Sequence, residues 1–317
     1  MANIPVGLIG CGGRGRGHVR ALHALADVEL VAVCDPVAAS REQVGDEWGV
    51  ERRYADVEAM LDAEELAAVI VATPAHLNAE AALPCLERGI DTLLEKPPGM
   101  SLDQTRALKE AAEASGARGM VGWNRRFDPL VLQVREEIES RGPIYQLVGE
   151  FHKSMSGFIA GGRFPEIVMD NMLLESPIHA IDLVRHLGGA PVAEVHSFVR
   201  RASAYKDVHA ALVVFENDCV AQICANYTTD ARLERYEIHG RDISAYIEGI
   251  STCELVCDGE HKHLQKEGTD STLAQAAHFF DCIKAGRPIG PPAADLDEAI
   301  ATMELSTAIL AGLRDDS

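Results

Sequence analysis

The sequence contains no long apolar run: none of its hydrophobic stretches approaches the roughly 20 residues that a membrane-spanning helix needs. Positive charge is also scarce, because 29 lysines and arginines stand against 49 acidic residues, giving a formal net charge of −20 at pH 7. Such an acidic chain is a poor match for nucleic acid or for an anionic membrane. We therefore expect no nucleic-acid partner, no membrane partner and no signal peptide.

Cysteine patterns that bind metals are missing too. The chain has eight cysteines, but none forms a C-x-x-C pair, and no histidine cluster accompanies them. We therefore expect reduced thiols, no structural metal and a cytoplasmic location. The length of 317 residues and the hydrophobic content of 47% are ordinary for a globular chain of about two domains.

Glycine, by contrast, is concentrated directly after the first apolar run. Gly10, Gly12 and Gly15 form a G-x-G-x-x-G pattern between a predicted strand and a predicted helix. A second apolar run, residues 30–34, ends on Asp35, which lies 20 residues after Gly15. The order of strand, glycine loop, helix, strand and acid is typical of dinucleotide-binding folds, in which the backbone approaches the pyrophosphate at a helix N-terminus.

Asp35 also indicates which dinucleotide is bound. A carboxylate at this strand end accepts hydrogen bonds from the ribose 2′-hydroxyl and repels a 2′-phosphate, and no arginine follows it before Arg41. We therefore expect NAD as the cofactor, with NADP disfavoured. The cofactor contacts predicted in this part of the chain are Gly10, Gly12, Gly13, Arg14, Gly15 and Asp35.

The pattern of predicted elements changes after residue 124. Strands and helices alternate over residues 1–124, which predicts an α/β Rossmann domain with a doubly wound parallel sheet. From residue 125 to 317, closely spaced strands predict an α+β substrate-binding domain with a mostly antiparallel open sheet, and the last helix could pack back on the first domain. The strand at 208–215 is apolar on both faces, so a second subunit or the chain itself covers its outer face. We expect a homodimer or homotetramer formed through this sheet.

Polar clusters follow three predicted strands of the first domain, and ligands bind at the carboxyl ends of such strands. Lys96 is one of only seven lysines, and it ends an apolar strand just before two prolines. A lysine held there could stabilise negative charge on a substrate oxygen; a surface ion pair with Glu95 is the competing interpretation. The cofactor contacts predicted at the strand ends are Thr73, Pro74, His76, Asn78, Glu95, Lys96, Asn124 and Arg125.

A predicted helix at residues 173–187 carries Glu175, His179 and Asp182 at positions i, i+4 and i+7, which share one face. Histidine can move a proton near neutral pH, and a carboxylate one turn away can fix its tautomer. Three interpretations stay open: a catalytic histidine, a buried histidine with a structural role, and a metal site formed by the three side chains.

Together these segments resemble the Gfo/Idh/MocA family, of the glucose–fructose oxidoreductase and inositol dehydrogenase type. The resemblance implies NAD(P)-dependent hydride transfer at a hydroxyl-bearing carbon of a sugar, cyclitol or related polyol. It also implies that Lys96 lies in the substrate site and that His179 transfers the proton, with Glu175 as its orienting residue. The matching segments, in order over about 180 residues, are the glycine loop, Asp35-Pro36, Ala72-Thr73-Pro74, Glu95-Lys96-Pro97, Asn124-Arg125-Arg126-Phe127 and Glu175-x-x-x-His179-x-x-Asp182.

The sequence departs from the family pattern at two places. The family often has an aspartate four residues before the histidine, in a D-x-G-x-H context, where this chain has Glu175 and Pro177. The histidine usual near the Thr-Pro segment is also displaced, with Asn78 in its place and His76 two residues earlier.

Two other functions stay open from the sequence. One is a redox-neutral sugar enzyme of the glycosidase or lyase type, which retains its NAD through an oxidation, an elimination and a re-reduction. The other is a non-enzymatic NAD-sensing regulator, which the presence of both Lys96 and His179 disfavours. Weaker candidates for contacts with substrate hydroxyl groups are Arg126, Arg163, Asn171 and Asp182.

Overall fold

The computed structural model describes residues 3–162, 164–268 and 270–314. The chain divides into two compact units, one of residues 1–124 and 270–300 and the other of residues 125–269 and 301–317. One division thus falls directly after residue 124. Residues 270–300, which the sequence placed in the second domain, group with the first unit.

Sheet A of the first unit is a doubly wound sheet, as predicted. Its strands are β1 (Ile4–Ile9), β2 (Val28–Cys34), β3 (Arg52–Tyr54), β4 (Ala68–Val71), β5 (Asp91–Leu94), β6 (Gly119–Val121) and β15 (Ala294–Asp295). Their order is β15-β6-β5-β4-β1-β2-β3, and all pairs are parallel except that of β15 with β6. The order reverses between β1 and β4, which is where such sheets bind ligands. Strands β4 and β5 are buried throughout because helices cover both faces.

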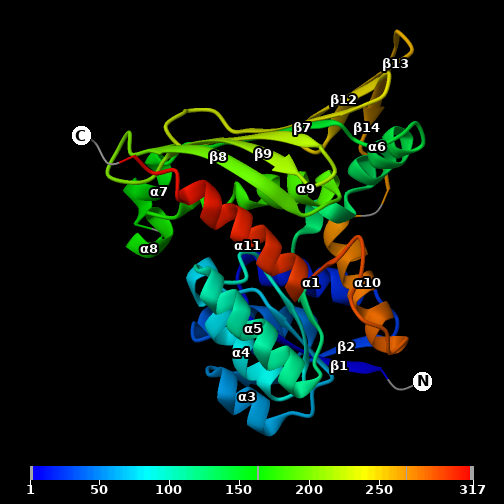
Figure 1. The fold of residues 1–317 in the computed structure, drawn as a ribbon. Coiled ribbons are helices and arrows are strands. Elements are labelled where there is room, and N and C mark those ends of the chain that lie inside the picture. Colours follow the sequence, from blue (N-terminus) through cyan, green and yellow to red (C-terminus); the bar gives the residue numbers. More distant parts are fainter. Residues whose placement is uncertain (1–2, 163, 269, 315–317) are drawn as a thin grey trace. The chain divides into compact units, whose positions relative to one another are not determined.

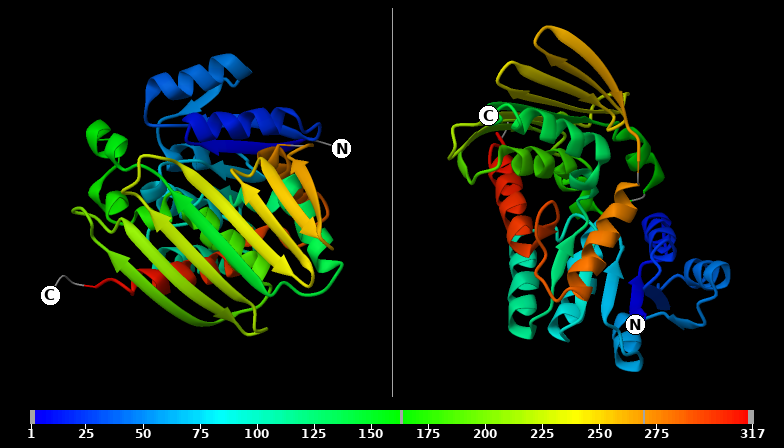
Figure 2. Two further views of the ribbon diagram at one scale, coloured as in Figure 1. Left: turned by 90° about the horizontal axis from the view of Figure 1, so that it is seen from above. Right: turned by 90° about the vertical axis from the view of Figure 1, so that its right-hand side faces the viewer.

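The helices of the first unit form two layers. They are α1 (Gly13–His23), α2 (Ala38–Trp48), α3 (Val57–Ala63), η1 (Ala75–Leu77), α4 (Asn78–Glu87), α5 (Leu102–Ser115) and α10 (Ser271–Lys284). Helices α4 and α5 lie side by side on one face of the sheet, and α1 and α10 lie on the other (Figures 1 and 2). Local signals bound α5: the Ser101 side chain accepts a hydrogen bond from the N–H of Gln104, and Gly116 follows the helix with φ +79°.

Sheet B of the second unit is open and mostly antiparallel, also as predicted (Figure 2, left). Its strands are β7 (Gln146–His152), β8 (Val192–Arg200), β9 (Val208–Phe215), β10 (Val220–Asn226), β11 (Leu233–Gly240), β12 (Ile243–Glu248), β13 (Thr252–Cys257) and β14 (Glu260–Gln265). The order is β14-β13-β12-β11-β7-β10-β9-β8, and only β7 and β10 pair in parallel. Residues 312–314 pair with Val199 and cover the β8 edge.

Helices pack on one face of sheet B and form the core of the second unit with it. These are α6 (Pro129–Glu139) and α9 (Ile178–Gly188), with α7 (Ser156–Gly161), α8 (Glu166–Met169) and η3 (Met172–Leu174) leading into α9. Two of the three divisions between the two units fall within η2 (Asn124–Phe127) and α11 (Leu296–Leu310), and the third precedes α10. The eight cysteines are all free, and within the described ranges no helix is long and apolar enough to cross a membrane.

The predicted helix at 173–187 begins later than expected. Residues 172–174 form the 3₁₀ helix η3, residues 175–177 form a turn, and α9 starts at Ile178. Pro177 occupies the N-cap position of α9, where its missing N–H costs no intrahelical hydrogen bond. Glu175 therefore lies before the helix that carries His179 and not on it, which corrects the expectation of one shared helical face.

Candidate functional site

The glycine loop after β1 requires glycine at two positions. Gly10 has φ +95°, and a Cβ there would lie 2.5 Å from the carbonyl oxygen of Ala72. A Cβ at Gly15 would lie 1.9 Å from the carbonyl oxygen of Gly10. Among the described residues, no atom lies within 4 Å of a Cβ built at Gly12 or Gly13, so the start of α1 faces open space. Gly12 supplies no side-chain cap, so the first N–H groups of α1 are available to an anion.

The Asp35 carboxylate lies beside this loop. Its two oxygens accept hydrogen bonds from the backbone N–H groups of Cys11 and Val37, each at 2.8 Å. A carboxylate has about four acceptor positions, so acceptor positions remain for a ribose diol. Arg41 donates to the carbonyl oxygen of Asp35 at 3.0 Å, so its guanidinium is engaged by the main chain. The loop, the start of α1 and Asp35 therefore fit NAD.

Glu95 directly follows β5 and is buried, with 4% of its surface exposed. Two side chains of α1, an arginine and a histidine, contact its carboxylate. Its Oε1 atom lies 3.0 Å from Nε of Arg14 and 2.8 Å from Nε2 of His18. Burial by itself raises the pKa of Glu95, but the His18 hydrogen bond and the Arg14 charge outweigh it and lower the pKa to about 2. Arg14 and Glu95, both predicted as cofactor contacts, thus bind each other.

Asn78 organises the backbone on both sides of Lys96. The side chain of Asn78 is fully buried, and its Nδ2 donates to the carbonyl oxygens of Glu95 at 3.0 Å and Pro97 at 2.9 Å. Its Oδ1 accepts a hydrogen bond from the hydroxyl of Thr73 at 2.8 Å. Lys96 itself is half-buried, and the Lys96–Pro97 peptide is cis. Asn78 is therefore a positioning residue for the lysine.

The two remaining residues of the Thr73–Asn78 segment that were predicted to contact the cofactor lie closer to the surface. Pro74 is exposed and His76 is half-buried, on η1. Both lie beyond the carboxyl end of β4, next to the point where the strand order reverses. Their contact with the cofactor stays a prediction.

His179 lies in the first turn of α9 and is largely buried. Its backbone N–H donates to the carbonyl oxygen of Ser176 at 3.1 Å. The carboxylate of Glu175 accepts a short hydrogen bond from the hydroxyl of Ser176, and its Oε2 lies 3.7 Å from Nζ of Lys153. Glu175 is thus held at the start of the helix by a serine and a lysine that the sequence analysis did not select.

Arg126 and Asp182 pair with each other inside the second unit. Nε and Nη2 of Arg126 donate to the two carboxylate oxygens of Asp182 at 2.8 and 2.6 Å, and the two residues are 1% and 0% exposed. The hydroxyl of Thr302 donates to the same carboxylate at 3.0 Å. This buried pair gives both residues a structural role in place of the expected substrate contacts. It also takes Asp182 out of the metal site considered from the sequence.

The other predicted contacts have protein partners as well. The Arg125 guanidinium forms a two-point ion pair with Glu234 at 2.8 and 3.0 Å, in the second unit. Within the first unit, Nδ2 of Asn124 donates to the hydroxyl of Ser271 at 3.2 Å. Asn171 donates to the carbonyl oxygen of Ile167 at 2.9 Å. Arg163 lies outside the described residues.

Sequence reasoning missed His18, Lys153 and Ser176. The scarcity of lysine, which drew attention to Lys96, applies equally to Lys153, and Lys153 also directly follows a strand, β7. His18 lies three residues after Gly15, so the two residues share the face of α1 that is buried. Ser176 has no such signal, because its role depends on how the chain turns before α9.

Comparison with known proteins agrees with this architecture. A model described as an oxidoreductase family with an NAD-binding Rossmann fold matches residues 4–123, and the GFO/IDH/MocA C-terminal domain matches residues 132–246. The scyllo-inositol 2-dehydrogenase (NAD(+)) of Bacillus subtilis (strain 168) is 26% identical over 332 residues, which cover 96% of this chain and 92% of that protein. The rhizopine catabolism protein MocA of Rhizobium meliloti is 28% identical over 326 residues, covering 98% and 96%.

Solved structures share the fold. Levoglucosan dehydrogenase in complex with NADH and L-sorbose superposes with a TM-score of 0.86 at 20% identity, covering 98% of this chain and 97% of that one. The two family models follow each other along most of the chain, and the first contains the glycine loop, Asp35 and Lys96. The chain therefore belongs to the Gfo/Idh/MocA family of NAD-binding oxidoreductases.

Proposed function

We propose that this enzyme is a dehydrogenase that transfers hydride between NAD and a hydroxyl-bearing carbon of a sugar, cyclitol or related polyol. The observation that carries the proposal is the setting of Lys96, a half-buried ammonium whose flanking carbonyl groups are both fixed by Asn78. It lies in the same unit as a glycine loop that fits NAD. The relatives that act on inositols support the substrate class.

Each residue has a separate task in this reaction. Bound NAD supplies the acceptor for a hydride. The ammonium of Lys96 donates a hydrogen bond to the reacting oxygen and lowers the cost of its negative charge. An imidazole nitrogen of His179 takes the proton of the same hydroxyl group, and Glu175 orients His179. The glycine loop binds the pyrophosphate and Asp35 binds the ribose.

The proposal is tested by following NADH formation with a panel of inositols, sugars and related polyols. For a substrate found in this way, we expect Lys96→Ala and His179→Ala each to lower kcat by about 10²–10⁴-fold, the range typical for a lost proton-transfer or charge-stabilising group. NAD binding, measured by calorimetry, should persist in both variants. Lys262→Ala, at an exposed position on β14, is the matched control.

Three outcomes would contradict parts of the proposal. Near-normal turnover in both variants would remove Lys96 and His179 from the mechanism. NAD that is released only on denaturation, with no net NADH formed from any compound, would indicate the redox-neutral type of sugar enzyme. NAD binding without turnover of any compound would indicate a sensor.

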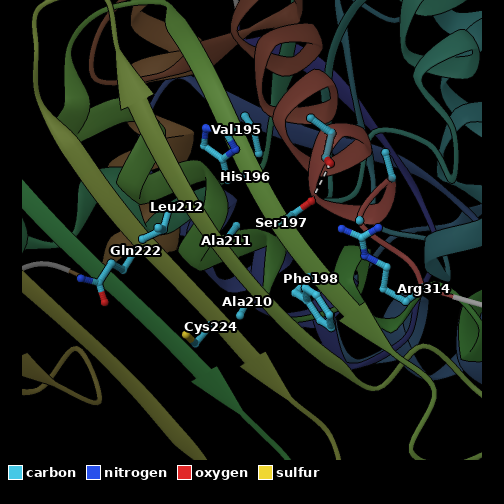
Figure 3. Close-up of a pocket in the computed structure, with 13 residues that line it drawn as sticks. Val195, His196, Ser197, Phe198, Ala210, Ala211, Leu212, Gln222, Cys224 and Arg314 are labelled. Atoms are coloured by element: carbon cyan, nitrogen blue, oxygen red, sulfur yellow. Dashed lines mark hydrogen bonds between the residues drawn. The ribbon is translucent and has the colours of Figure 1, made fainter.

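We also propose that two copies of the chain associate through the outer face of sheet B. The strands β8, β9 and β10 present large apolar side chains there: Phe198 is 53% exposed, Leu212 55% and Val220 43%. The strand register places all three on one face. Figure 3 shows this face where it forms a shallow pocket beside Arg314. An apolar patch on an open sheet face is typical of a subunit interface.

A further inference from the structure

A lysine at the end of β7 is fixed at both its main chain and its charged group. The backbone N–H of Lys153 donates to the carbonyl oxygen of Asn226 at 2.9 Å. Its ammonium lies 4.5 Å from the centre of the Phe158 ring, in a cation–π contact. The side chain is only 26% exposed. Lys153 therefore does not extend freely into solvent as most lysines do.

Hydrogen bonds through the hydroxyl of Ser176 connect the ammonium of Lys153 to the carboxylate of Glu175. Nζ of Lys153 donates to the hydroxyl oxygen of Ser176 at 3.3 Å, and that hydroxyl donates to Oε2 of Glu175. Nζ also lies 3.7 Å from the same Oε2 atom. Because lysine can only donate and an ionised carboxylate can only accept, the hydroxyl must donate toward Glu175. The arrangement therefore places the positive charge of Lys153 beside the carboxyl group of Glu175.

The same serine builds the start of α9, because its carbonyl oxygen accepts the N–H of His179 at 3.1 Å. Tyr227, which follows β10, is buried beside Ser176 and donates its hydroxyl to the carbonyl oxygen of Met172 at 3.0 Å. Burial, and then the charge of Glu175, raise the pKa of Tyr227, so its phenol stays neutral. Lys153 is a cation that faces Glu175 in this cluster.

We propose that Lys153 is a positioning residue for the proton-transfer step. Lys153 fixes the carboxylate of Glu175 through Ser176, at the start of the helix that carries His179. The kinetic consequence rests on the proposed function. Glutamate has one more rotatable bond than aspartate, so its carboxylate loses more freedom when it takes a single position. Lys153 and Ser176 provide the contacts that offset this cost.

The experiment compares Lys153→Met, which keeps an unbranched side chain as far as Cε but removes the charge, with Lys153→Arg, which keeps the charge. We expect Lys153→Met to lower kcat roughly tenfold because of the displaced catalytic group, with a KM change of less than about threefold. The pKa of the Glu175 carboxyl, followed by carbon NMR of the full chain and assigned with Glu175→Gln, should rise by about half a unit because a nearby positive charge is lost. Lys153→Arg should keep kcat and the Glu175 pKa close to those of the unmodified chain, and Lys262→Met should change neither quantity.

A folded Lys153→Met protein with unchanged kcat and unchanged Glu175 pKa overturns the proposal, even if its Tm is lower, because the lysine would then support only the fold. A double-mutant cycle adds a second criterion: in a Glu175→Gln background, Lys153→Met should lower kcat less than about twofold further. A full tenfold loss in that background would show that Lys153 acts independently of Glu175, which also overturns the proposal.

Ser176→Ala keeps every charge and covers the case in which Lys153→Met does not fold. We expect it to lower kcat by about fivefold, within the range of one lost hydrogen bond, and an unchanged kcat would contradict the inference. The NMR titration needs neither NAD nor substrate. If no polyol reduces NAD, the proposed function fails, while the titration still decides whether Lys153 holds Glu175.

Discussion

Buried polar side chains of the first unit decide where Lys96 stands. Asn78 holds the carbonyl groups before and after the lysine, and Arg14 and His18 hold the carboxylate of its neighbour Glu95. A lysine side chain has four rotatable carbon–carbon bonds and many rotamers. Fixing its backbone lowers the conformational entropy that is lost when the ammonium takes one position against the substrate.

Asn78→Asp should damage this site more than Asn78→Ala. Aspartate replaces two N–H donors by an oxygen that faces the carbonyl groups of Glu95 and Pro97, whereas alanine only leaves those groups without a partner. We expect kcat to fall about tenfold for alanine and further for aspartate. Steady-state kinetics measures this, with Thr73→Val as a milder control because it removes one hydroxyl donor. Equal kcat values for Asn78→Ala and the unmodified chain would contradict the assigned role.

At the scale of elements, α9 joins the site to the core of its unit. Its first turn carries His179, and one turn later Asp182 receives the Arg126 guanidinium and the Thr302 hydroxyl. An ion pair with both members almost fully buried is favourable only while both charges are present. The pair therefore fixes η2, α9 and the second half of α11 to one another through side chains.

Asp182→Asn should destabilise the second unit by about 3–5 kcal/mol, because it leaves the buried guanidinium of Arg126 without a counter-charge. Asp258→Asn breaks the exposed ion pair with Arg141 and should cost no more than about 1 kcal/mol. Asparagine tolerates the φ of +53° at residue 258. Urea unfolding of both variants measures the difference, and equal midpoints would contradict the structural role of Asp182.

At the scale of the whole molecule, the two units should lose stability in different pH ranges. In the second unit, burial lowers the pKa of His209 from 6.5 to about 4. The unfolded chain therefore binds a proton that the folded unit excludes, and the contribution of His209 to stability falls as the pH drops from about 6.5 to about 4. In the first unit, Glu95 has its pKa lowered from 4.5 to about 2, so its contribution is complete above pH 4.5 and is lost between about 4.5 and 2.

Each of these shifts corresponds to a stability change of about 3 kcal/mol at most. Replacing His209 by glutamine should flatten the dependence of the unfolding free energy on pH between 6.5 and 4. Urea titrations across this interval test it, with the exposed His263→Gln on β14 as control. An unchanged slope in His209→Gln would show that His209 does not carry the dependence.

The proposed association through sheet B predicts a change in mass. Leu212→Glu places a charge on the outer face of β9, where burying it against a second copy would cost several kcal/mol. We expect the unmodified chain to sediment as a dimer or tetramer and Leu212→Glu as a smaller species. Ile167→Glu changes an equally exposed apolar side chain on α8 and should keep the original mass. An unmodified chain that sediments as a monomer would end this proposal.

The sequence by itself determined the features that depend on local geometry and short-range pattern. The glycine loop was predictable because only glycine tolerates the φ of Gly10 and the close approach at Gly15. The fold class followed from alternating strands and helices in one half and closely spaced strands in the other. The ends of α5 are local features of the same kind, because Ser101 caps its start and Gly116 ends it.

Only the tertiary structure decided which polar side chains bind each other. Arg126 and Asp182 are 56 positions apart along the chain, and Lys153 and Ser176 are 23 apart, so no spacing rule brings either pair together. The hairpin of β13 and β14 escaped prediction because its second strand is polar at most positions and is defined by pairing with its neighbour. Side-chain partners depend on how distant elements pack, and a one-dimensional pattern does not contain that packing.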